Sequence, residues 1–239
     1  MTACLLLLLL LLARCCGQPL LNASSAYVTN LAGAGTGSID GLGLSAAFAN
    51  PSSVALSSTT LYVSDWSANR IRAVSFAGVA TTLVSGAVTA NGVGTAAGIM
   101  GPSGIALDPT GALLYVISSR EHSVRVLAIA NASVTTLAGT GAAAYVNGQG
   151  SAAAFANPIA CAVTPDGALF IGDTNNNRLR RCSPSGLVTL FAGSGVVGAA
   201  DGVGSNAQFS ALTFIAADGF NLFVSDTGAR EGVAEQPVA

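Results

Sequence analysis

The chain has 239 residues, enough for one large domain or two small ones. Half of the residues are apolar (51%), and only 8% are charged, against about 25% in an average soluble domain. This composition excludes a charged disordered chain. The formal charge is −2 and no residue is lysine, which excludes the clustered cations of a nucleic-acid-binding surface. We therefore expect no nucleic-acid partner.

The N-terminus resembles a secretory leader. Eight leucines in a row, Leu5–Leu12, are too short to span a membrane as a helix but suit the apolar core of a signal peptide. The small residues Cys15 and Gly17 fit a cleavage site. We predict a signal peptide over 1–17 and a short linker over 18–27. The mature protein is then secreted and keeps no stable membrane span, with an uncleaved anchor as the alternative.

Two Asn-x-Ser sequons follow the leader, at Asn22 and Asn131. In a secreted chain each is a candidate glycosylation site. Asn131 is also a plausible turn residue, and both interpretations can hold together.

One pattern of six landmarks recurs four times, roughly 50 residues apart. Each copy has a Val-Thr-x-Leu-Ala-Gly-like strand, a Gly-rich turn, a Ser- or Thr-led run, a proline or leucine, an apolar strand and an Asn-Arg-x-Arg-like strand, which fades in the last copy. The Gly-rich turns are Asp40–Gly43, Asn91–Gly94, Asn147–Gly150 and Asp201–Gly204, and the apolar strands are Leu61–Asp65, Leu114–Ser118, Leu169–Asp173 and Leu222–Asp226. The repetition predicts four units of one fold, at about 28–85, 86–139, 140–193 and 194–239.

Each unit contains four apolar runs of strand length separated by turn residues. In the first unit they are Val54–Ser57, Leu61–Ser64, Arg70–Phe76 and Ala80–Val84. Four strands per repeat are typical of a β-propeller blade, and radial stacking buries both faces of each sheet. We predict an all-β fold: a β-propeller over 28–239 with about four four-stranded blades. The last blade is incomplete, because its third strand is replaced after Asp226.

The Ser- or Thr-led run predicts one helical turn capped by the Ser or Thr side chain. The Phe that ends it is predicted to wedge between blades. These wedges are Phe48, Phe155 and Phe209, with Ile99 or Met100 as the weaker counterpart in the second unit.

The two ends of the repeat array are predicted to meet. Val28–Leu31 matches the fourth strand of a blade and arrives without the first three. Placed beside the last blade, it would cover an exposed sheet edge and close a small ring. An open arc of a larger ring is the alternative.

We predict no disulfide between Cys161 and Cys182. They fall on the first and third strands of one unit, about 9–10 Å apart. A disulfide needs Cα atoms within about 7 Å.

At several of these landmarks the chain resembles the NHL-repeat family. The matching segments are Asn50–Ala55, Leu61–Asp65, Asn69–Arg72 and Asp173–Arg178. The linker of each unit is similar to the longer variant found in extracellular and teneurin-like propellers. The resemblance covers about residues 28–226 and implies a propeller, usually of six blades in this family. It implies little about activity.

The inventory of catalytic residues is small. The only histidine, His122, stands at a turn position that Asn occupies in two other units, so we predict a turn residue there. A three-histidine zinc site is impossible within one chain, and no Gly-x-Ser-x-Gly motif occurs. The Asp-Gly-x-Gly motifs favour turns over cation or phosphate loops. We therefore predict no catalytic, cofactor or metal residues and no cofactor.

Five arginines are candidates for either an anion-binding ring or a structural role. They follow Asp65 or Asp173 closely along the chain, so an Asp that caps the turn and pairs with the returning Arg is the favoured interpretation. The candidates are Arg70, Arg72, Arg178, Arg180 and Arg181.

Two functions of different classes follow. The first is a non-catalytic binding or scaffold module for an extracellular protein or glycan. The alternative is a metal-dependent propeller hydrolase or lyase, gluconolactonase-like, with a site in the channel. The RNA binding of some intracellular NHL propellers conflicts with the leader and the charge.

Overall fold

A computed structural model describes residues 28–86, 88–228 and 233–237, the last range by its backbone. The predicted signal peptide, the whole predicted linker and the sequon at Asn22 lie outside these residues. The chain divides into two compact units, Met1–Asn30 and Leu31–Ala239. In the first unit only residues 28–30 are described, and they form no regular secondary structure.

The unit Leu31–Ala239 contains three five-stranded antiparallel sheets and one sheet of three described strands. The first sheet has β1 (Gly41–Leu42), β2 (Pro51–Leu56), β3 (Thr60–Asp65), β4 (Arg70–Ser75) and β5 (Val79–Ser85). The second has β6 (Gly92–Val93), β7 (Pro102–Leu107), β8 (Leu113–Ser118), β9 (Ser123–Ala128) and β10 (Ser133–Ala138). The third has β11 (Gly148–Gln149), β12 (Pro158–Val163), β13 (Leu169–Asp173), β14 (Arg178–Cys182) and β15 (Leu187–Ala192). The fourth has β16 (Leu212–Ala217), β17 (Asn221–Asp226) and β18 (Val233–Pro237).

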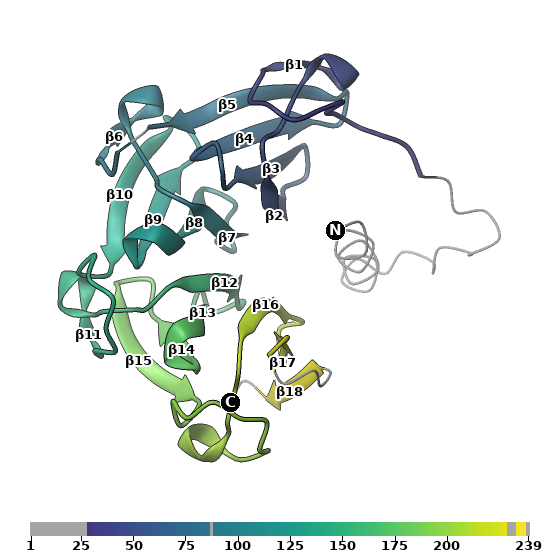
Figure 1. The fold of residues 1–239 in the computed structure, drawn as a ribbon. Coiled ribbons are helices and arrows are strands. Elements are labelled where there is room, and N and C mark those ends of the chain that lie inside the picture. Colours follow the sequence, from purple (N-terminus) through teal and green to yellow (C-terminus); the bar gives the residue numbers. More distant parts are fainter. Residues whose placement is uncertain (1–27, 87, 229–232, 238–239) are drawn as a thin grey trace. The chain divides into compact units, whose positions relative to one another are not determined.

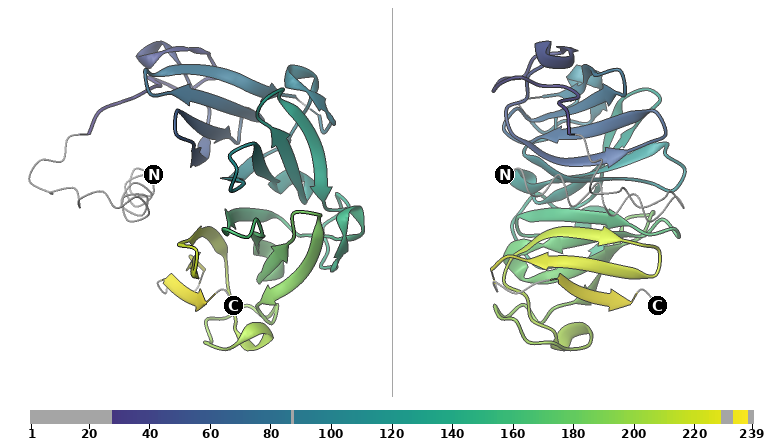
Figure 2. Two further views of the ribbon diagram at one scale, coloured as in Figure 1. Left: turned by 180° about the vertical axis from the view of Figure 1, so that it is seen from behind. Right: turned by 90° about the vertical axis from the view of Figure 1, so that its right-hand side faces the viewer.

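Consecutive sheets pack through their inner strands: β2 contacts β7, β7 contacts β12, and β12 contacts β16. Within this unit the sheets follow one another in a curved row with these strands on the inside (Figure 1 and Figure 2). This is the arrangement of propeller blades, and it confirms the predicted all-β propeller fold. Each of the first three blades has the four predicted strands and, in addition, a two-residue strand beside the fourth.

Three of the four predicted wedges lie at blade interfaces, and the prediction for Phe48 is wrong. Phe155 is fully buried in a cluster that joins β8 and β9 of the second blade to β12–β15 of the third. Phe209 fills the same place between the third and fourth blades, and Ile99, rather than Met100, between the first and second. Phe48 is half-buried and packs within the first blade only. No core cluster of the described residues joins the fourth blade to the first.

The predicted helical turn exists but lies earlier than expected. It is a 3-10 turn that recurs in every unit, at η2 (Gly43–Ser45), η3 (Gly94–Ala96), η5 (Gly150–Ala152) and η7 (Gly204–Asn206). The second and third units have a further 3-10 turn each, η4 (Ser119–Glu121) and η6 (Thr174–Asn176). No side chain caps the recurring turns, so the predicted Ser or Thr cap is wrong. In the first three units the first N–H instead donates to a carbonyl of the turn between the third and fourth strands, as Gly43 does to Gly78 at 2.9 Å.

The Asp-Gly-x-Gly motifs are turns, as predicted. The second glycine has a positive φ in all four copies: Gly43, Gly94, Gly150 and Gly204 lie between +54° and +58°. Side chains with a Cβ rarely adopt this conformation. The first glycine, Gly41, has no room for a Cβ, which would lie 2.9 Å from the Ser45 backbone.

Two predictions about the chain ends are wrong: that Val28–Leu31 forms a strand beside the last blade, and that the last blade lacks a third strand. Residues 28–33 form no strand, and the Leu31 carbonyl lies against Gly78 of the first blade. The described neighbours of β17 are β16 and β18. The last blade therefore has a third strand, Val233–Pro237, that the sequence did not reveal. This strand pairs with β17 through backbone hydrogen bonds, which form whatever the side chains are. An alternating apolar pattern is therefore not required, and the sequence shows none there.

Cys161 on β12 and Cys182 on β14 are separate, buried thiols with β13 between them. The prediction of no disulfide is confirmed. Burial raises the pKa of both thiols, that of Cys182 to about 12, which suits apolar core residues rather than nucleophiles.

Candidate binding site

The largest fully buried side chains are three arginines, one from each of the first three blades. Arg72, Arg125 and Arg180 stand at the same position on the third strand of their blades, and each has 0% relative exposure. Of these, Arg125 was not among the candidates. A signal was present, because His122–Arg125 aligns with Asn69–Arg72 in the repeat.

Each buried arginine fastens the Gly-rich loop of its unit to the sheet. Arg180 donates to the carbonyls of Val146 and Ala154 and to the side chain of Asn147 at 2.8–3.2 Å. Arg72 makes the same set of bonds to Ile39, Ala47 and Asp40, and Arg125 to Ala90, Gly98 and Asn91. The guanidinium groups are thus bonded to protein oxygens, which favours the structural role for Arg72 and Arg180.

The predicted pairing of Asp with the returning Arg holds in one blade. Asp173 and Arg180 form a fully buried ion pair at 2.7 Å. Burial raises the pKa of Asp173, against the hydrogen bonds from Ala156 and Asn176 and the charge of Arg180. In the first blade Arg72 pairs instead with Asp40, at 2.8 Å. There Asp65 accepts the backbone N–H groups of Ala49 and Asn50.

In the second blade a residue that sequence analysis missed takes over the role of this Asp. Ser118 stands at the position of Asp65 and Asp173 and is too short to replace a carboxylate. Glu121 reaches back, accepts the Met100 N–H and the Ser118 hydroxyl, and pairs with Arg125 at 3.3 Å. Glu121 is the only acid in the turn after Ser118. This was the signal in the sequence that could have identified it.

The turn between the second and third strands links neighbouring blades. Asn69, His122 and Asn177 all adopt a positive φ of 50–53° there, so His122 is a turn residue, as predicted. The Asn69 side chain accepts the Gly101 N–H of the second blade at 2.8 Å. His122 Nδ1 accepts the Asn157 N–H of the third blade at 3.0 Å. The histidine is therefore an inter-blade contact as well as a turn.

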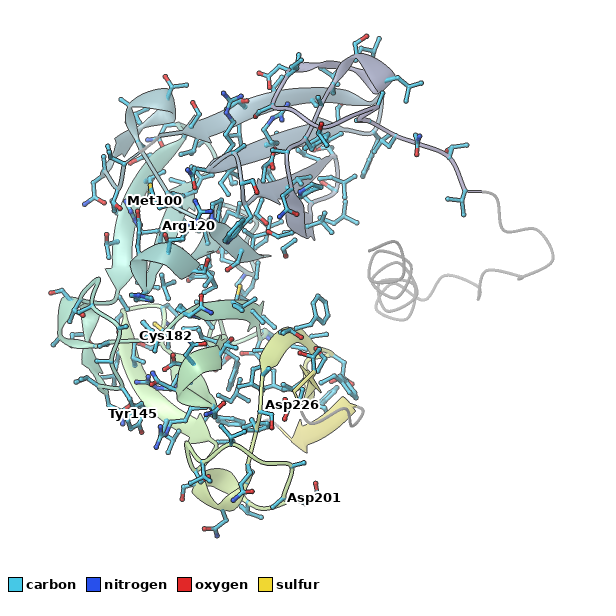
Figure 3. All side chains as sticks on the ribbon, in the orientation of Figure 1. Met100, Arg120, Tyr145, Cys182, Asp201 and Asp226 are labelled. Atoms are coloured by element: carbon cyan, nitrogen blue, oxygen red, sulfur yellow. The ribbon has the colours of Figure 1, made fainter. Side chains whose placement is uncertain are left out.

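The other candidate arginines lie nearer the surface. Arg70 donates to the Ser38 carbonyl, and Arg178 donates to the Ser194 carbonyl while stacking on Tyr145. Figure 3 labels this tyrosine. Arg181 forms an exposed pair with Asp166 at 3.2 Å. The contacts of Arg70 and Arg181 are local to their units, whereas Ser194 is the first residue of the next unit. An anion-binding role for these three arginines stays a prediction. The candidate glycosylation residue Asn131 is exposed and accepts the Ser133 N–H within its turn.

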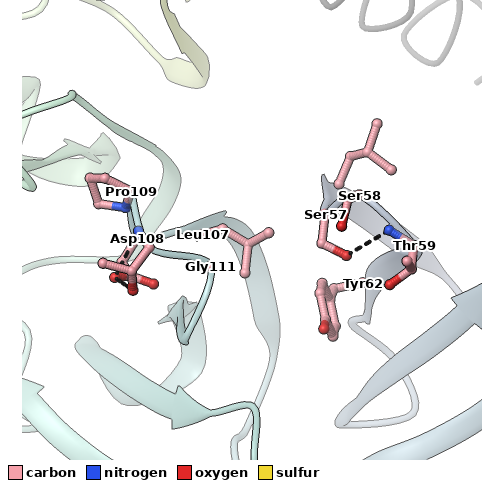
Figure 4. A pocket seen from close by; sticks show the side chains of 10 residues that line it. Ser57, Ser58, Thr59, Tyr62, Leu107, Asp108, Pro109 and Gly111 are labelled. Carbon is pink, nitrogen blue, oxygen red and sulfur yellow. Dashed lines mark hydrogen bonds between the residues drawn. The ribbon is translucent and has the colours of Figure 1, made fainter.

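An open pocket of about 480 Å³ lies where the first and second blades meet. Its walls are the turn between β2 and β3 and the turn between β7 and β8, which face each other across the opening (Figure 4). The lining residues are Leu56, Ser57, Ser58, Thr59, Tyr62, Leu107, Asp108, Pro109, Thr110 and Gly111. A pocket of this size lies within the usual range for small-molecule sites.

Two of the lining residues hold the turns in place. Ser57 accepts the N–H groups of Thr59 and Thr60, and Asp108 accepts those of Thr110 and Leu113. Partial burial opposes the charge of Asp108, but these hydrogen bonds outweigh it and hold the pKa of its carboxyl below the usual value. Asp108 is therefore an anionic turn residue at the pocket wall.

Tyr62 contributes a polar group that the fold leaves free. The residue is 6% exposed, and its ring packs in the core cluster between the first two blades. No hydrogen bond joins its hydroxyl to the described residues, nor is the hydroxyl among their sealed unpaired atoms, which are Ser38 Oγ and three arginine Nε atoms. The phenol oxygen is therefore not sealed in the core, and Tyr62 is one of the residues that line the pocket.

The described ranges contain neither a cluster of metal-ligating side chains nor a membrane-spanning helix. Within them, no three His, Cys, Asp or Glu side chains converge as a metal site requires. None of the helices in these ranges has the length and hydrophobicity that crossing a membrane demands.

Comparison with known proteins places this fold in a class, the β-propellers. No protein-family model matches the chain. The chain is 32% identical over 151 residues to NHL repeat-containing protein 2 of Bos taurus. It is 30% identical over 146 residues to the protein SUPPRESSOR OF QUENCHING 1, chloroplastic, of Arabidopsis thaliana. Both matches cover 56% of this chain but only 21% and 14% of the relatives, so the chain spans a small part of their length.

Solved structures agree on the fold. An auxiliary nutrient binding protein from Bacteroides ovatus superposes with a TM-score of 0.62 at 19% identity, over 80% of this chain and 49% of that one. One from Bacteroides thetaiotaomicron gives 0.58 at 21% identity, over 74% and 44%. The resemblance to NHL-repeat proteins is thereby confirmed: the chain carries an NHL-repeat β-propeller fold.

Proposed function

We propose that the chain is a secreted, non-catalytic binding module that engages an extracellular protein or glycan through the face formed by the β2–β3 and β7–β8 turns. The observation that carries the proposal is the open pocket of about 480 Å³ between these turns. It stands on two packed blades, so its walls are held by the sheets beneath them. Sites of this kind bind ligands in a largely preformed shape.

The chemistry of the described residues supports binding rather than catalysis. The acids Asp65, Asp108 and Asp173 accept backbone N–H groups that hold turns and strand starts. The histidine joins two blades. Residues bound in this way position the scaffold, and the pocket itself is lined by hydroxyl and apolar groups.

The structural neighbours lend further support. Two of them are described as auxiliary nutrient binding proteins, and we transfer to this chain only the general idea that its propeller holds a ligand. The leucine-rich leader supports secretion. The metal-dependent hydrolase or lyase stays the alternative, and a stoichiometric metal in the purified protein would favour it.

Two measurements test the proposal. The full chain is expressed in secretory cells, and we expect it in the medium with an N-terminus at residue 18. The secreted protein is then screened against an array of glycans and a panel of extracellular proteins. Saturable binding to a member of either set supports the proposal, while retention in the cell or no binding to either set contradicts it.

A further inference from the structure

We infer that the pocket between the β2–β3 and β7–β8 turns binds a neutral saccharide unit, with the hydroxyls of Tyr62 and Ser58 as its specific contacts. The inference rests on the proposed function and narrows it to one ligand class.

The free polar atoms of the pocket suit hydroxyl groups. Most of its side-chain oxygens are already bonded within the turns, as those of Ser57, Asp108 and Thr110 are. The Tyr62 and Ser58 hydroxyls make no hydrogen bond to the described residues. Each can donate one hydrogen bond and accept others, which matches the hydroxyls of a sugar, since these also do both.

Three apolar side chains complete the lining. Leu56 is 40% exposed, and Leu107 and Pro109 lie on the opposite side of the opening. A sugar ring has C–H faces that pack on such groups while its hydroxyls bond at the rim. Most of the exposed lining is polar, which suits a ligand rich in hydroxyl groups.

The charge of the pocket selects against anions. No Arg or His is among the lining residues, and Asp108 contributes a negative charge. An anionic ligand would face this carboxylate without a compensating cation, and like charges disfavour binding. Neutral saccharides are therefore expected to bind better than their sulfated or sialylated counterparts.

The repeat itself provides variants that should fold. Tyr62, Tyr115 and Phe170 occupy the same register position, each opposite an alanine of the first strand. Because the third blade carries Phe there, Tyr62→Phe should keep the packing and remove only the hydroxyl. Tyr115→Phe makes the same change in the second blade, outside the pocket, and is the matched control.

The experiment uses the full secreted chain on an array of neutral oligosaccharides and their sulfated or sialylated counterparts. The best-bound neutral oligosaccharide is then titrated by calorimetry against wild type, Tyr62→Phe, Ser58→Ala and Tyr115→Phe. We expect Tyr62→Phe and Ser58→Ala each to weaken binding roughly two- to tenfold, the usual effect of one neutral hydrogen bond. Tyr115→Phe should bind like wild type, and all melting temperatures should agree.

The inference would be overturned by preferential binding of anionic glycans, by binding to proteins only, or by wild-type affinity in Tyr62→Phe. The proposed function survives each of these results, because a ligand still binds. If the chain binds no glycan and no protein, the proposed function fails as well. An equal loss of affinity for the neutral oligosaccharide in Tyr62→Phe and Tyr115→Phe would also contradict the assignment to this pocket.

Discussion

The third and fourth blades share a wedge and an Asp at the end of the second strand, but they differ on the third strand. In both, a Phe wedges against the preceding blade, Phe155 in the third and Phe209 in the fourth. In both, an Asp at the end of the second strand accepts backbone N–H groups at the start of the first. Figure 3 marks this Asp226 and the loop residue Asp201 in the fourth blade.

The difference lies on the third strand. Register places Arg180 opposite Ile171 in the third blade, and Ala234 opposite Val224 in the fourth. The fourth blade therefore keeps its wedge and its Asp while its third strand has alanine at the arginine position. The comparison teaches that two devices are separable. The wedge fastens a blade to its neighbour, and the arginine fastens the Gly-rich loop to its own blade.

The largest expected effect comes from the wedge. Phe155→Ala should lower the free energy of unfolding by about 3–5 kcal/mol, as for a fully buried aromatic side chain. Phe48→Ala should cost clearly less, because Phe48 is half-buried and contacts only its own blade. Urea titrations of both variants give the comparison, and equal losses would contradict the inter-blade role of Phe155.

Arg180→Met should cost about 3 kcal/mol at neutral pH, because it leaves the carboxylate of Asp173 buried without its partner. Burial raises the pKa of Asp173, and loss of Arg180 removes a charge that opposes this. A raised carboxyl pKa in the folded state favours the protonated form, so it adds stability at acid pH that is lost as pH rises. The deficit of the variant should therefore shrink as the pH falls toward about 4.

Melting curves from neutral to acid pH test this pH dependence. They are recorded for wild type, for Arg180→Met and for the double variant that adds Asp173→Asn. The double variant should recover part of the loss at neutral pH. A deficit that is constant with pH and unchanged in the double variant would count against the buried pair.

The inter-blade hydrogen bond of His122 is a smaller contribution. His122→Ala should cost about 1 kcal/mol, the usual value for one hydrogen bond. His122→Asn should lie within about 0.5 kcal/mol of wild type, because Asn stands at this turn in the first and third blades. Chemical denaturation of the two variants ranks them, and equal stability would mean that the contact to Asn157 contributes nothing.

The smallest effect concerns Asp40, which pairs with Arg72 and is half-exposed. Partial burial opposes its charge, but the hydrogen bonds from Thr82 and the charge of Arg72 prevail and lower the pKa of its carboxyl. A lowered pKa adds stability above about pH 4 that is lost as the pH falls through the folded-state value. Asp40→Asn places here the residue found at Asn91 and Asn147. It should reduce this loss of stability at acid pH. An unchanged loss in melting curves would contradict the pairing.

Sequence analysis located the features that recur at fixed spacing, and it missed a residue that takes over the role of another. The wedges, the Gly-rich turns and the strand pattern recur at fixed spacing, so they could be located before the structure was known. Glu121 escaped because its carboxylate substitutes for an Asp from a different position, a change visible only when side-chain reach is known. The helical turn was placed too late because Ser45 looks like a cap, whereas positive φ at Gly43 starts the turn.

The strand predicted at Val28–Leu31 failed for a related reason. Its residues match the fourth-strand motif, but a strand forms only where a partner edge is available, and Leu31 lies against Gly78 instead. The pocket was also beyond sequence analysis. It depends on which turns of two neighbouring blades face each other, and on the one tyrosine hydroxyl there that the fold leaves unbonded.

Hydrogen exchange followed by mass spectrometry on Phe155→Ala and Arg180→Met tests the separation of the two devices most directly. We expect Arg180→Met to speed exchange in the loop over 139–154 while β8 and β9 stay protected. Phe155→Ala should instead speed exchange on both sides of the interface between the second and third blades. If the two variants gave the same exchange pattern, wedge and arginine would act as one unit, and the separation inferred from the third and fourth blades would be wrong.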